Sequence, residues 1–540
     1  MAKRLRSIHI TMAVATIATF LLLFIPSSSA LSHSHMCEDT LYPDLCLSTL
    51  SSSLKTTPRQ SIAATLNLTA KSATEAISSC SNLSHEISST DLPDQRALSD
   101  CEELLSTSLG DISSCLADLS NSSSRSSSIH LQTFLSAAIT NQYTCLDGFS
   151  YANHTLRSRI EANIVNISRH ISNSLAMFKK VRASELPENS DSGEVFEEYG
   201  RVDGGFPAWI PPKDRRLLQA SANQTNADLV VAKDGSGDFT TISEAIAKVP
   251  DNGKTRFVIY IKTGEYLENV DVGEKKTNLM LIGDGIEKTV VKASRNVVDG
   301  WTTFRSATFA VVGSNFIARD MSFENSAGPS KHQAVALRSG ADLSAFYRCS
   351  FVGYQDTLYV HSLRQFYREC DVYGTVDFIF GNAAVVLQDC NLYARRPNPN
   401  QRNLFTAQGR VDPNQNTGIS IQNCKVAAAA DLIPVQSSFK NYLGRPWKQY
   451  SRTIFMQSDI GDLIDPAGWF EWSGDFALST LYYGEYMNRG PGADTSNRVK
   501  WPGYRVINSS SEASQFTVAS FIQGNEWLPA SNVAFYAGLK

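Results

Sequence analysis

The sequence predicts two folded domains, an all-α four-helix bundle followed by an all-β right-handed parallel β-helix. Three observations lead to this prediction. Apolar residues recur at intervals of three and four between Cys37 and Val181, a segment rich in Glu, Ser, Asp, Gly and Pro follows, and short β-prone segments then repeat about every 20 residues. A chain of 540 residues exceeds one ordinary domain, and 42% hydrophobic with 19% charged residues is a globular composition.

The first 30 residues are expected to be a signal peptide. Basic residues at positions 3, 4 and 6 precede an apolar run from Ile8 to Ile25, and Ser28-Ser29-Ala30 follows as a small-x-small cleavage pattern. The apolar run is long for a signal peptide, so an uncleaved membrane anchor is the alternative. Ten cysteines and seven Asn-x-Ser/Thr sequons, five of them between Asn67 and Asn166, agree with an oxidising secretory route.

Residues 31–185 are expected to form the helical bundle. Their apolar residues step by three or four in four runs joined by short polar links, which is the pattern of an up-down bundle. Two runs lie near 62–87 and 129–149, and the other two consist of Leu98, Cys101, Leu105, Leu109, Ile112, Leu116 and Leu119, and of Ile160, Ile164, Ile167, Ile171, Leu175 and Phe178.

The cysteines of this region predict disulfides. Cys37 and Cys46 would close a small hairpin ahead of the bundle, and Cys101 and Cys145 are candidates to join its second helix to its third. Connectivity cannot be read from spacing, which leaves other pairings open for the remaining two cysteines, Cys80 and Cys115.

Residues 186–225 are expected to be a linker, because the helical periodicity gives way to Glu, Ser, Asp, Gly and Pro. The linker contains Lys213-Asp214-Arg215-Arg216-Leu217-Leu218, a dibasic stretch in a segment of exposed composition. Proteases prefer such sites. The sequence therefore predicts processing by a protease at Arg215-Arg216.

Residues 226–540 are expected to form the β-helix, and one stretch within them is a near repeat. Phe346-Tyr347-Arg348-Cys349 is followed by Phe366-Tyr367-Arg368-Glu369-Cys370, and each copy has an aspartate seven residues after its cysteine. Equivalent positions on adjacent coils lie about 4.8 Å apart. This spacing suits a disulfide between Cys349 and Cys370. Fainter copies of the pattern stand at 316–323, 386–393 and 419–426.

The same register would place the carboxylates of Asp356 and Asp377 side by side in one groove. Like charges at that distance cannot both ionise easily, so one pKa should rise toward that of a general acid while the other group stays a carboxylate. The pattern predicts hydrolysis by paired carboxylates. The competing interpretation is that both aspartates are turn residues, a common role for Asp.

Four further side chains are expected to serve these aspartates. Gln355 directly precedes the first of them and Gln333 lies about one coil earlier, and primary amides donate hydrogen bonds to an oxyanion without titrating. Arg445 can hold Asp377 bidentately. Trp447 can stack on a sugar face, although a core tryptophan is the alternative.

Other functional classes fit less well. No Gly-x-Ser-x-Gly elbow occurs, and His332 and His361 are the only histidines after residue 226, which disfavours a serine hydrolase. No His-x-x-x-His or Cys-x-x-Cys pair argues for zinc. Positive and negative residues are nearly balanced, with a formal net charge of −4, which implies neither a nucleic-acid nor a membrane surface.

Several ordered motifs make residues from about Asn226 to Lys540 resemble the plant pectinesterases, the pectin methylesterases of carbohydrate esterase family eight. Residues from Cys37 to about Val181 resemble the pectinesterase-inhibitor domain, with TCLDGF at 144–149 among weaker motifs. The whole resembles a pectinesterase precursor with an inhibitor-like pro-region. The motifs of the C-terminal part are GWTTFRSATFAV at 300–311, the Gln333 region, GYQDTLY at 353–359, GTVDFIFGN at 374–382 and YLGRPW at 442–447.

The resemblance implies hydrolysis of the methyl esters of galacturonate units in cell-wall pectin. Carried onto this sequence, it makes Asp377 the nucleophile on the ester carbonyl, and Asp356 the acid that protonates methanol and then the base that activates water. Gln333 and Gln355 would stabilise the oxyanion, while Arg445 would position Asp377. The residues expected to contact the polymer are Thr303, Gln333, Phe380, Arg445 and Trp447.

The resemblance also implies that no metal or organic cofactor is needed. It makes the protein a monomer that is secreted to the cell wall or apoplast. Its partners would be methyl-esterified homogalacturonan, a processing protease and a proteinaceous inhibitor, with no nucleic acid.

Two other functions stay open as alternatives. A pectate lyase or polygalacturonase would share the scaffold, but a lyase needs a calcium-binding carboxylate cluster and a basic proton abstractor, so the Gln-Asp, Asp and Arg set fits ester hydrolysis better. A non-catalytic wall protein would use the bundle to inhibit a partner esterase. Asp356 and Asp377 argue against this for the whole chain but not for the released bundle. Our hypothesis for the bundle is intracellular silencing in cis, with action in trans left open.

Overall fold

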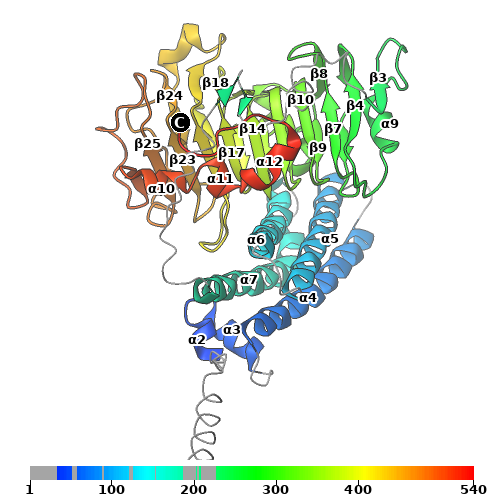
Figure 1. The fold of residues 1–540 in the computed structure, drawn as a ribbon, viewed down its shortest axis with the longest axis vertical. Helices are drawn as coiled ribbons and strands as arrows, with labels where there is room; N and C mark the ends of the chain where they lie inside the picture. Colours follow the sequence, from blue (N-terminus) through cyan, green and yellow to red (C-terminus); the bar gives the residue numbers. More distant parts are fainter. Residues whose placement is uncertain are drawn as a thin grey trace, which may run out of the picture.

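The computed structural model places helices and strands in two parts, a helical bundle and a stack of β-coils (Figure 1). The predicted signal peptide and the dibasic stretch at 213–218 lie outside the described residues. The structure describes residues 33–51, 57–87, 91–120, 126–151, 154–185, 202–203, 206–207 and 227–540.

The predicted four-helix bundle is confirmed within the described residues. The second helix packs against the first and the third, and the fourth packs against the first and the third. A helical hairpin precedes them. The elements are α2 (His33–Cys37), α3 (Pro43–Leu50), α4 (Pro58–Glu86), α5 (Leu92–Ser120), α6 (Ser126–Asp147), the short η1 (Gly148–Tyr151) and α7 (His154–Glu185).

Local chemistry explains where these helices begin and how they are tied. Thr57 and Gln60 form a capping box at the start of α4, in which each side chain accepts a hydrogen bond from the other residue's backbone N–H. The predicted disulfides Cys37–Cys46 and Cys101–Cys145 are confirmed, and the second joins α5 to α6. Cys80 and Cys115 are buried free thiols.

The second part is a parallel β-helix, as predicted. Successive coils add strands to three parallel sheets, and two long strands, β10 (Ile317–Asn325) and β12 (Ser344–Val352), belong to two sheets at once. The first sheet also holds β3 (Leu229–Val231), β4 (Phe257–Ile261), β7 (Leu279–Ile282), β14 (Arg364–Arg368), β17 (Ala384–Gln388), β20 (Gly418–Gln422), β23 (Arg452–Met456), β25 (Tyr482–Tyr486) and β26 (Tyr504–Val506).

The third sheet faces the bundle and is called the groove sheet here. It consists of β6 (Val270–Val272), β9 (Phe309–Val311), β11 (Leu337–Ser339), β13 (Leu358–Val360), β16 (Ile379–Gly381), β19 (Asn403–Gln408) and β22 (Asn441–Gly444). The second sheet adds to β10 and β12 the strands β5 (Gly264–Leu267), β8 (Thr289–Ala293), β15 (Asp371–Gly374), β18 (Asn391–Ala394), β21 (Lys425–Ala428) and β24 (Asp459–Ile460).

The period of 21 predicted from the near repeat is the register between two adjacent coils. Phe346 of β12 pairs with Tyr367 of β14, 21 positions later. Other coils are longer, since Leu387 pairs with Ile421, 34 positions later. The additional residues form loops at the coil edges. Phenylalanines stack inside the coils, with the rings of Phe323 and Phe351 5.7 Å apart.

The predicted disulfide between Cys349 and Cys370 is wrong, because both are free thiols in this structure. They begin an inward row of four that continues through Cys390 and Cys424. Each thiol donates to a backbone carbonyl of the preceding coil, at 3.4 to 3.5 Å. Parallel side chains keep their Cβ atoms about one strand spacing apart, roughly 4.8 Å, which exceeds the Cβ separation that a disulfide requires, about 3.8 Å.

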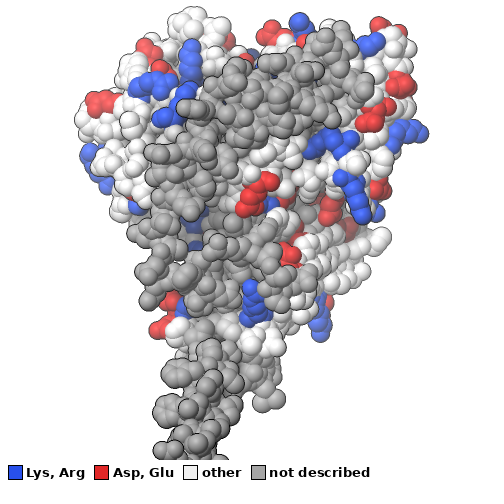
Figure 2. Space-filling view, in the orientation of Figure 1, with Lys and Arg blue, Asp and Glu red and all other residues white. Residues whose placement is uncertain are grey.

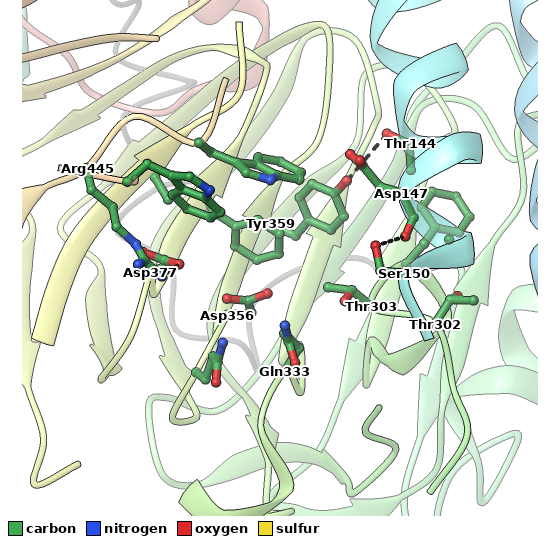
Figure 3. Close-up of a pocket in the computed structure, with 17 residues that line it drawn as sticks. Thr144, Asp147, Ser150, Thr302, Thr303, Gln333, Asp356, Tyr359, Asp377 and Arg445 are labelled. Carbon is green, nitrogen blue, oxygen red and sulfur yellow. Dashed lines mark hydrogen bonds and ion pairs between the residues drawn. The ribbon is translucent and has the colours of Figure 1, made fainter. Parts of the chain in front are cut away.

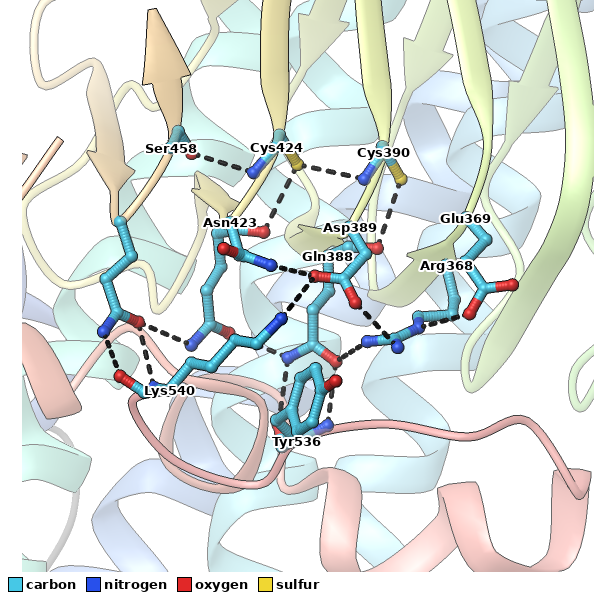
Figure 4. A network of polar contacts seen from close by, with 12 residues as sticks. Arg368, Glu369, Gln388, Asp389, Cys390, Asn423, Cys424, Ser458, Tyr536 and Lys540 are labelled. Carbon is cyan, nitrogen blue, oxygen red and sulfur yellow. Dashed lines mark hydrogen bonds and ion pairs between the residues drawn. The ribbon is translucent and has the colours of Figure 1, made fainter. Parts of the chain in front are cut away.

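The C-terminal tail is held along the β-helix by a ladder of glutamines (Figure 4). Gln388 exchanges two hydrogen bonds with the backbone of Tyr536, and Gln457 does the same with Lys540. Gln422 donates to the carbonyl of Gly538 between them. These contacts fix the end of the segment that contains α10 (Ser510–Ser514), α11 (Val518–Phe521) and α12 (Gly524–Ser531).

The helix α6 packs against the β-helix through one polar face. Thr133, Ser136, Thr140, Thr144 and Asp147 follow one another at intervals of three or four and therefore share that face. We call them the α6 stripe. The first four are buried. Their partners include Asn416 for Thr133 and Ser136, Asn382 for Thr140, His361 for Thr144 and Lys448 for Asp147.

The surface agrees with the nearly balanced composition. On the face displayed in Figure 2, basic and acidic side chains are interspersed over the coloured surface. Among the described residues, no helix combines the length and the apolarity that crossing a bilayer requires.

Two short strands, β1 (Val202–Asp203) and β2 (Phe206–Pro207), pair antiparallel, and α9 (Ile242–Ala247) lies near the start of the β-helix.

Candidate active site

A cavity of about 300 Å³ lies where the groove sheet meets the bundle. It contains two carboxylates, and Figure 3 shows Asp356 near its centre with Asp377 and Arg445 to one side and Thr302 and Thr303 to the other. The structure thus brings together every catalytic and polymer-binding residue expected from the sequence. They are Thr303, Gln333, Gln355, Asp356, Asp377, Phe380, Arg445 and Trp447.

Arg445 holds Asp377 in a bidentate ion pair. Its Nε donates to Oδ1 at 2.9 Å and its Nη2 donates to Oδ2 at 2.7 Å. The side chain of Asp377 is only 7% exposed. The two contacts compensate the charge of the buried carboxylate and fix its direction. Such a group can act as a nucleophile.

Asp356 is buried beside Asp377 and forms no ion pair with any of the described residues. Burial raises the pKa of Asp356 well above its ordinary value, and the neighbouring charge of Asp377 raises it further, against a smaller opposing effect of Arg445. The two carboxyl groups therefore differ in the way that the sequence predicted. Asp356 is suited to carry a proton while Asp377 carries a charge.

Stacked turns place these residues. Gln355 and Asp356 precede β13, and Asp377 precedes β16 on the next coil. The N–H of Asp356 donates to the carbonyl of Val376 at 3.0 Å, which links the two turns. Asp356 and Asp377 both have left-handed φ angles, 63° and 51°, a conformation that aspartate tolerates better than most residues. Both aspartates are therefore turn residues, as the competing interpretation held, and this backbone role is compatible with a catalytic role for their side chains.

The two glutamines line the same cavity from adjacent turns. Gln333 and Gln355 are both partly exposed, and the N–H of Ala334, next to Gln333, donates to the carbonyl of Gln355 at 3.2 Å. Figure 3 shows the side-chain amide of Gln333 near Asp356, on the side away from Arg445. The primary amides of both glutamines can donate to an oxygen that becomes negatively charged.

Aromatic rings form one wall of the cavity. The rings of Tyr359 and Phe380 stack at 4.2 Å, and the edge of Trp447 meets Phe380 at 5.9 Å. A Cβ on Gly409 would come within 2.8 Å of the Trp447 ring, so this close approach requires glycine. Trp447 thus lines the cavity, and the alternative interpretation, a tryptophan inside the core, is wrong. Flat apolar walls of this kind suit sugar rings.

Several lining residues were not predicted from the sequence. Tyr359 lies within the quoted motif at 353–359 and could have been included on that ground. Phe304 and Trp472 also line the cavity, and Arg445 lies over the Trp472 ring at 4.3 Å. Phe304 lies within the quoted motif at 300–311 and could have been included on the same ground, whereas spacing alone does not distinguish Trp472 from a core aromatic.

The bundle supplies the other part of the cavity lining, which the sequence did not predict. Thr144, Asp147 and two η1 residues face the two carboxylates across the cavity. Thr144 Oγ1 lies 2.9 Å from Nε2 of His361, and burial with the nearby charge of Arg338 lowers the pKa of His361 to about 3. His361 is therefore neutral while the bundle covers it. The bundle closes the groove beside the candidate catalytic residues.

Family comparisons match both parts of the chain. Residues 228–525 match the family model described as "Pectinesterase", and residues 32–177 match "Plant invertase/pectin methylesterase inhibitor". The first match alone covers more than half of the chain.

Relatives align along most of the chain. It is 49% identical over 539 residues to "Pectinesterase 2" of Arabidopsis thaliana, an alignment that covers 95% of this chain and 92% of the relative. It is 51% identical over 516 residues to "Pectinesterase 1" of Citrus sinensis, which covers 93% of this chain and 88% of the relative.

Solved structures resemble the β-helix part. A pectin methylesterase from carrot superposes with a TM-score of 0.58 and 62% identity, and covers 58% of this chain and 99% of its own. A pectin methylesterase from Aspergillus niger has a TM-score of 0.50 and 29% identity, with 56% and 96% covered. The chain therefore belongs to the pectinesterase family: it is a pectin methylesterase that hydrolyses methyl esters of pectin, and it carries an N-terminal inhibitor-like pro-region.

Proposed function

We propose that the two aspartates of the cavity divide the ester hydrolysis between them. Asp377 attacks the carbonyl carbon of a galacturonate methyl ester, and Gln333 and Gln355 donate hydrogen bonds to the resulting oxyanion. Asp356 gives its proton to the departing methoxide, which leaves as methanol. The product of this step is a mixed anhydride between Asp377 and the polymer.

Asp356 then acts as a base. Its carboxylate takes a proton from water as the water oxygen adds to the anhydride carbonyl. The bond to Asp377 breaks, the polymer leaves with a carboxylic acid, and both aspartates return to their starting states. Thr303, Phe380 and Trp447 hold the polymer in this scheme, while Arg445 positions Asp377.

One observation carries the proposal. Asp377 is buried in a bidentate pair with Arg445, and its neighbour Asp356 has a pKa raised by burial and by the charge of Asp377. This arrangement supports a division of roles in one cavity, with Asp377 as the nucleophile and Asp356 as the acid.

We propose further that the bundle silences this site in cis until a protease cuts at Arg215-Arg216. The α6 stripe fills the groove beside the aspartates, which supports the first part. The basic pair in a linker-like segment supports the second. A chain that completes its own groove in this way acts as a monomer.

The site of action in this proposal is the plant cell wall. The expected signal peptide and the sequons support secretion, and the membership of the pectinesterase family supports the wall as the destination. The domain boundaries proposed are those expected from the sequence, at 31–185, 186–225 and 226–540.

The test compares methanol release from highly methylated pectin by three proteins. They are the fragment Leu217–Lys540, the same fragment with Asp377→Asn, and the uncleaved chain. We expect release by the fragment, none by the mutant and little by the uncleaved chain. A folded fragment that releases no methanol would refute the catalytic proposal, while an uncleaved chain as active as the fragment would refute silencing in cis.

A further inference from the structure

Thr302 and Arg305 of the β-helix hold a carboxylate that belongs to the bundle. Thr302 Oγ1 donates to Oδ2 of Asp100 at 2.5 Å, and Arg305 Nε donates to Oδ1 at 2.6 Å. The backbone N–H of Arg305 donates to Thr302 Oγ1 at 3.1 Å, which directs the hydroxyl proton toward the carboxylate. The Asp100 side chain is 1% exposed. Both donors are therefore directed at one buried carboxyl group.

The acids that Arg305 binds all come from outside its own domain. Its second ion pair joins Nη2 to Oε2 of Glu103, and Asp100 and Glu103 both lie on α5. Among the described residues, the β-helix provides no ion-pair partner for this guanidinium. Departure of the bundle would therefore leave Arg305 and the Thr302 hydroxyl as donors without an acceptor. Partly buried cations are normally paired.

This site lies beside the candidate catalytic residues. Thr302 lines the catalytic cavity and also an adjoining cavity of about 340 Å³, whose lining includes Trp301 and His332. Figure 3 shows Thr302 on the other side of Asp356 from Asp377 and Arg445. A polymer bound across Asp356 would therefore extend toward Thr302 and Arg305.

The chemistry of the polymer fits such a site. Each galacturonate unit carries a methyl ester before the reaction and a carboxylate after it. A guanidinium and a hydroxyl bind a carboxylate strongly and an uncharged ester weakly, because only the carboxylate offers charge-assisted hydrogen bonds. The site would therefore distinguish de-esterified units from esterified ones.

We propose that Thr302 and Arg305 form a carboxylate subsite for a de-esterified galacturonate unit next to the ester being cleaved, and that Asp100 occupies this subsite in the uncleaved chain. The proposal rests on the ester hydrolysis proposed above. It makes Arg305 a residue that determines specificity, because it favours polymer that already carries free carboxylates.

A second cation shows the same pattern on the Trp447 side of the cavity. Lys448 Nζ lies 2.8 Å from Oδ1 of Asp147, and this is its only ion pair among the described residues. Asp147 itself lines the catalytic cavity. Bundle carboxylates thus contact β-helix cations at two places along the groove, as expected if they replace polymer carboxylates.

The test uses the fragment Leu217–Lys540, since the carrot pectin methylesterase, matched over 99% of its length by 58% of this chain, shows that a chain of this extent folds without a bundle. Wild type, Arg305→Gln and Arg305→Lys are assayed on fully methylated and on half-methylated pectin. We expect Arg305→Gln to lower kcat/KM about tenfold on half-methylated pectin and to leave it unchanged on fully methylated pectin. Arg305→Lys keeps the positive charge and should therefore retain part of the activity that Arg305→Gln loses on half-methylated pectin. The matched control is Arg489→Gln, which removes an exposed cation that pairs with Asp459.

Binding of fully de-esterified oligogalacturonate by the same proteins provides a readout that needs no catalysis. Arg305→Gln should weaken this binding about tenfold, and added salt should reduce the difference. An equal loss of kcat/KM on both pectins, or unchanged binding of the oligomer by a folded Arg305→Gln fragment, would overturn the proposal. A wild-type fragment that binds the oligomer but cleaves neither pectin would refute the proposed function and leave the subsite supported.

Discussion

Arg445 and Asp377 face each other with two parallel hydrogen bonds of 2.9 and 2.7 Å, and no other cation among the described residues is paired with this aspartate. Removing the guanidinium would leave a buried carboxylate without compensation, which typically costs about 2–5 kcal/mol. We expect Arg445→Gln to lower kcat of the fragment Leu217–Lys540 at least thirtyfold, which is the factor that corresponds to ~2 kcal/mol.

Arg445→Lys separates charge from geometry. It keeps the charge but cannot make both contacts, so we expect an intermediate kcat. Arg402→Gln is the control, because Arg402 is exposed and stacks on Phe470. Unchanged kcat in a folded Arg445→Gln fragment would exclude the positioning role.

Asp356 should make the β-helix less stable as the pH rises. Its pKa is raised by burial and by Asp377, so the folded state retains a proton that the unfolded state loses near the ordinary value for aspartate. Stability is therefore full below that ordinary value and declines as the pH rises toward the raised pKa. We expect Asp356→Asn to abolish methanol release and to flatten this decline, which raises Tm of the fragment at neutral pH by about 2 °C or more. A Tm profile parallel to that of wild type would contradict the assigned pKa shift.

The pairing of the two aspartates could be predicted because the coil between them is minimal. Asp356 and Asp377 stand 21 positions apart, as do the paired residues Phe346 and Tyr367. No loop interrupts that coil, so sequence spacing and spatial register coincide. Arg445 lies two coils later, beyond loops of unequal length, so chemistry and the family motif predict its position and spacing does not.

Apolar periodicity does not predict the α6 stripe. Its members are small polar residues in a segment rich in serine, and apolar periodicity alone identifies a helix by the opposite face. Their spacing of three and four was readable, however, and buried partners such as Asn382 and His361 explain why this face is polar. The cysteine row shows a different limit, because spacing gives the distance between Cα atoms but not the direction of the side chains.

The two disulfides predict how reduction affects stability. Both lie in the helical part, and the cysteines of the β-helix are free. Cys101–Cys145 closes a segment with a sequence separation of 44, which stabilises by about 4 kcal/mol in the chain-entropy account. We expect a reductant to lower the unfolding temperature of the bundle and to leave that of the fragment Leu217–Lys540 unchanged. A reductant-sensitive fragment would contradict the free thiols.

Asp100 should make silencing stronger in acid. Burial raises its pKa from 3.8 to about 6, an effect that Arg305 and Thr302 only partly offset. The docked state thus binds a proton that the separated state releases near pH 3.8, so docking is strongest below that value and weakens as the pH rises to about 6. His361 opposes this, because its lowered pKa disfavours docking in acid.

The contribution of Asp100 can be isolated by comparing the uncleaved wild type with uncleaved Asp100→Asn. The activity of each relative to the fragment is measured between pH 4 and 6. This activity ratio should rise with pH more steeply in wild type than in Asp100→Asn. The additional rise is at most roughly a hundredfold, since the pKa of Asp100 differs by about two between the docked and the separated state. Glu75→Gln, which changes a carboxylate 68% exposed, should behave as wild type. Identical slopes in wild type and Asp100→Asn would show that Asp100 does not take up a proton on docking.

Ser136 offers the sharpest way to open the groove without disturbing the bundle. It is fully buried, its Oγ accepts from the N–H of Asn416, and its carbonyl accepts from Gln415. An arginine there cannot fit between α6 and the β-helix, whereas the core of the bundle lies on the other face of α6. We expect the uncleaved Ser136→Arg chain to release methanol at a rate close to that of the fragment. Ser113→Arg, at an exposed position of α5, should stay as inactive as the uncleaved wild type. If Ser136→Arg is folded, no longer docked and still inactive, then the bundle does not silence the enzyme by occupying the groove.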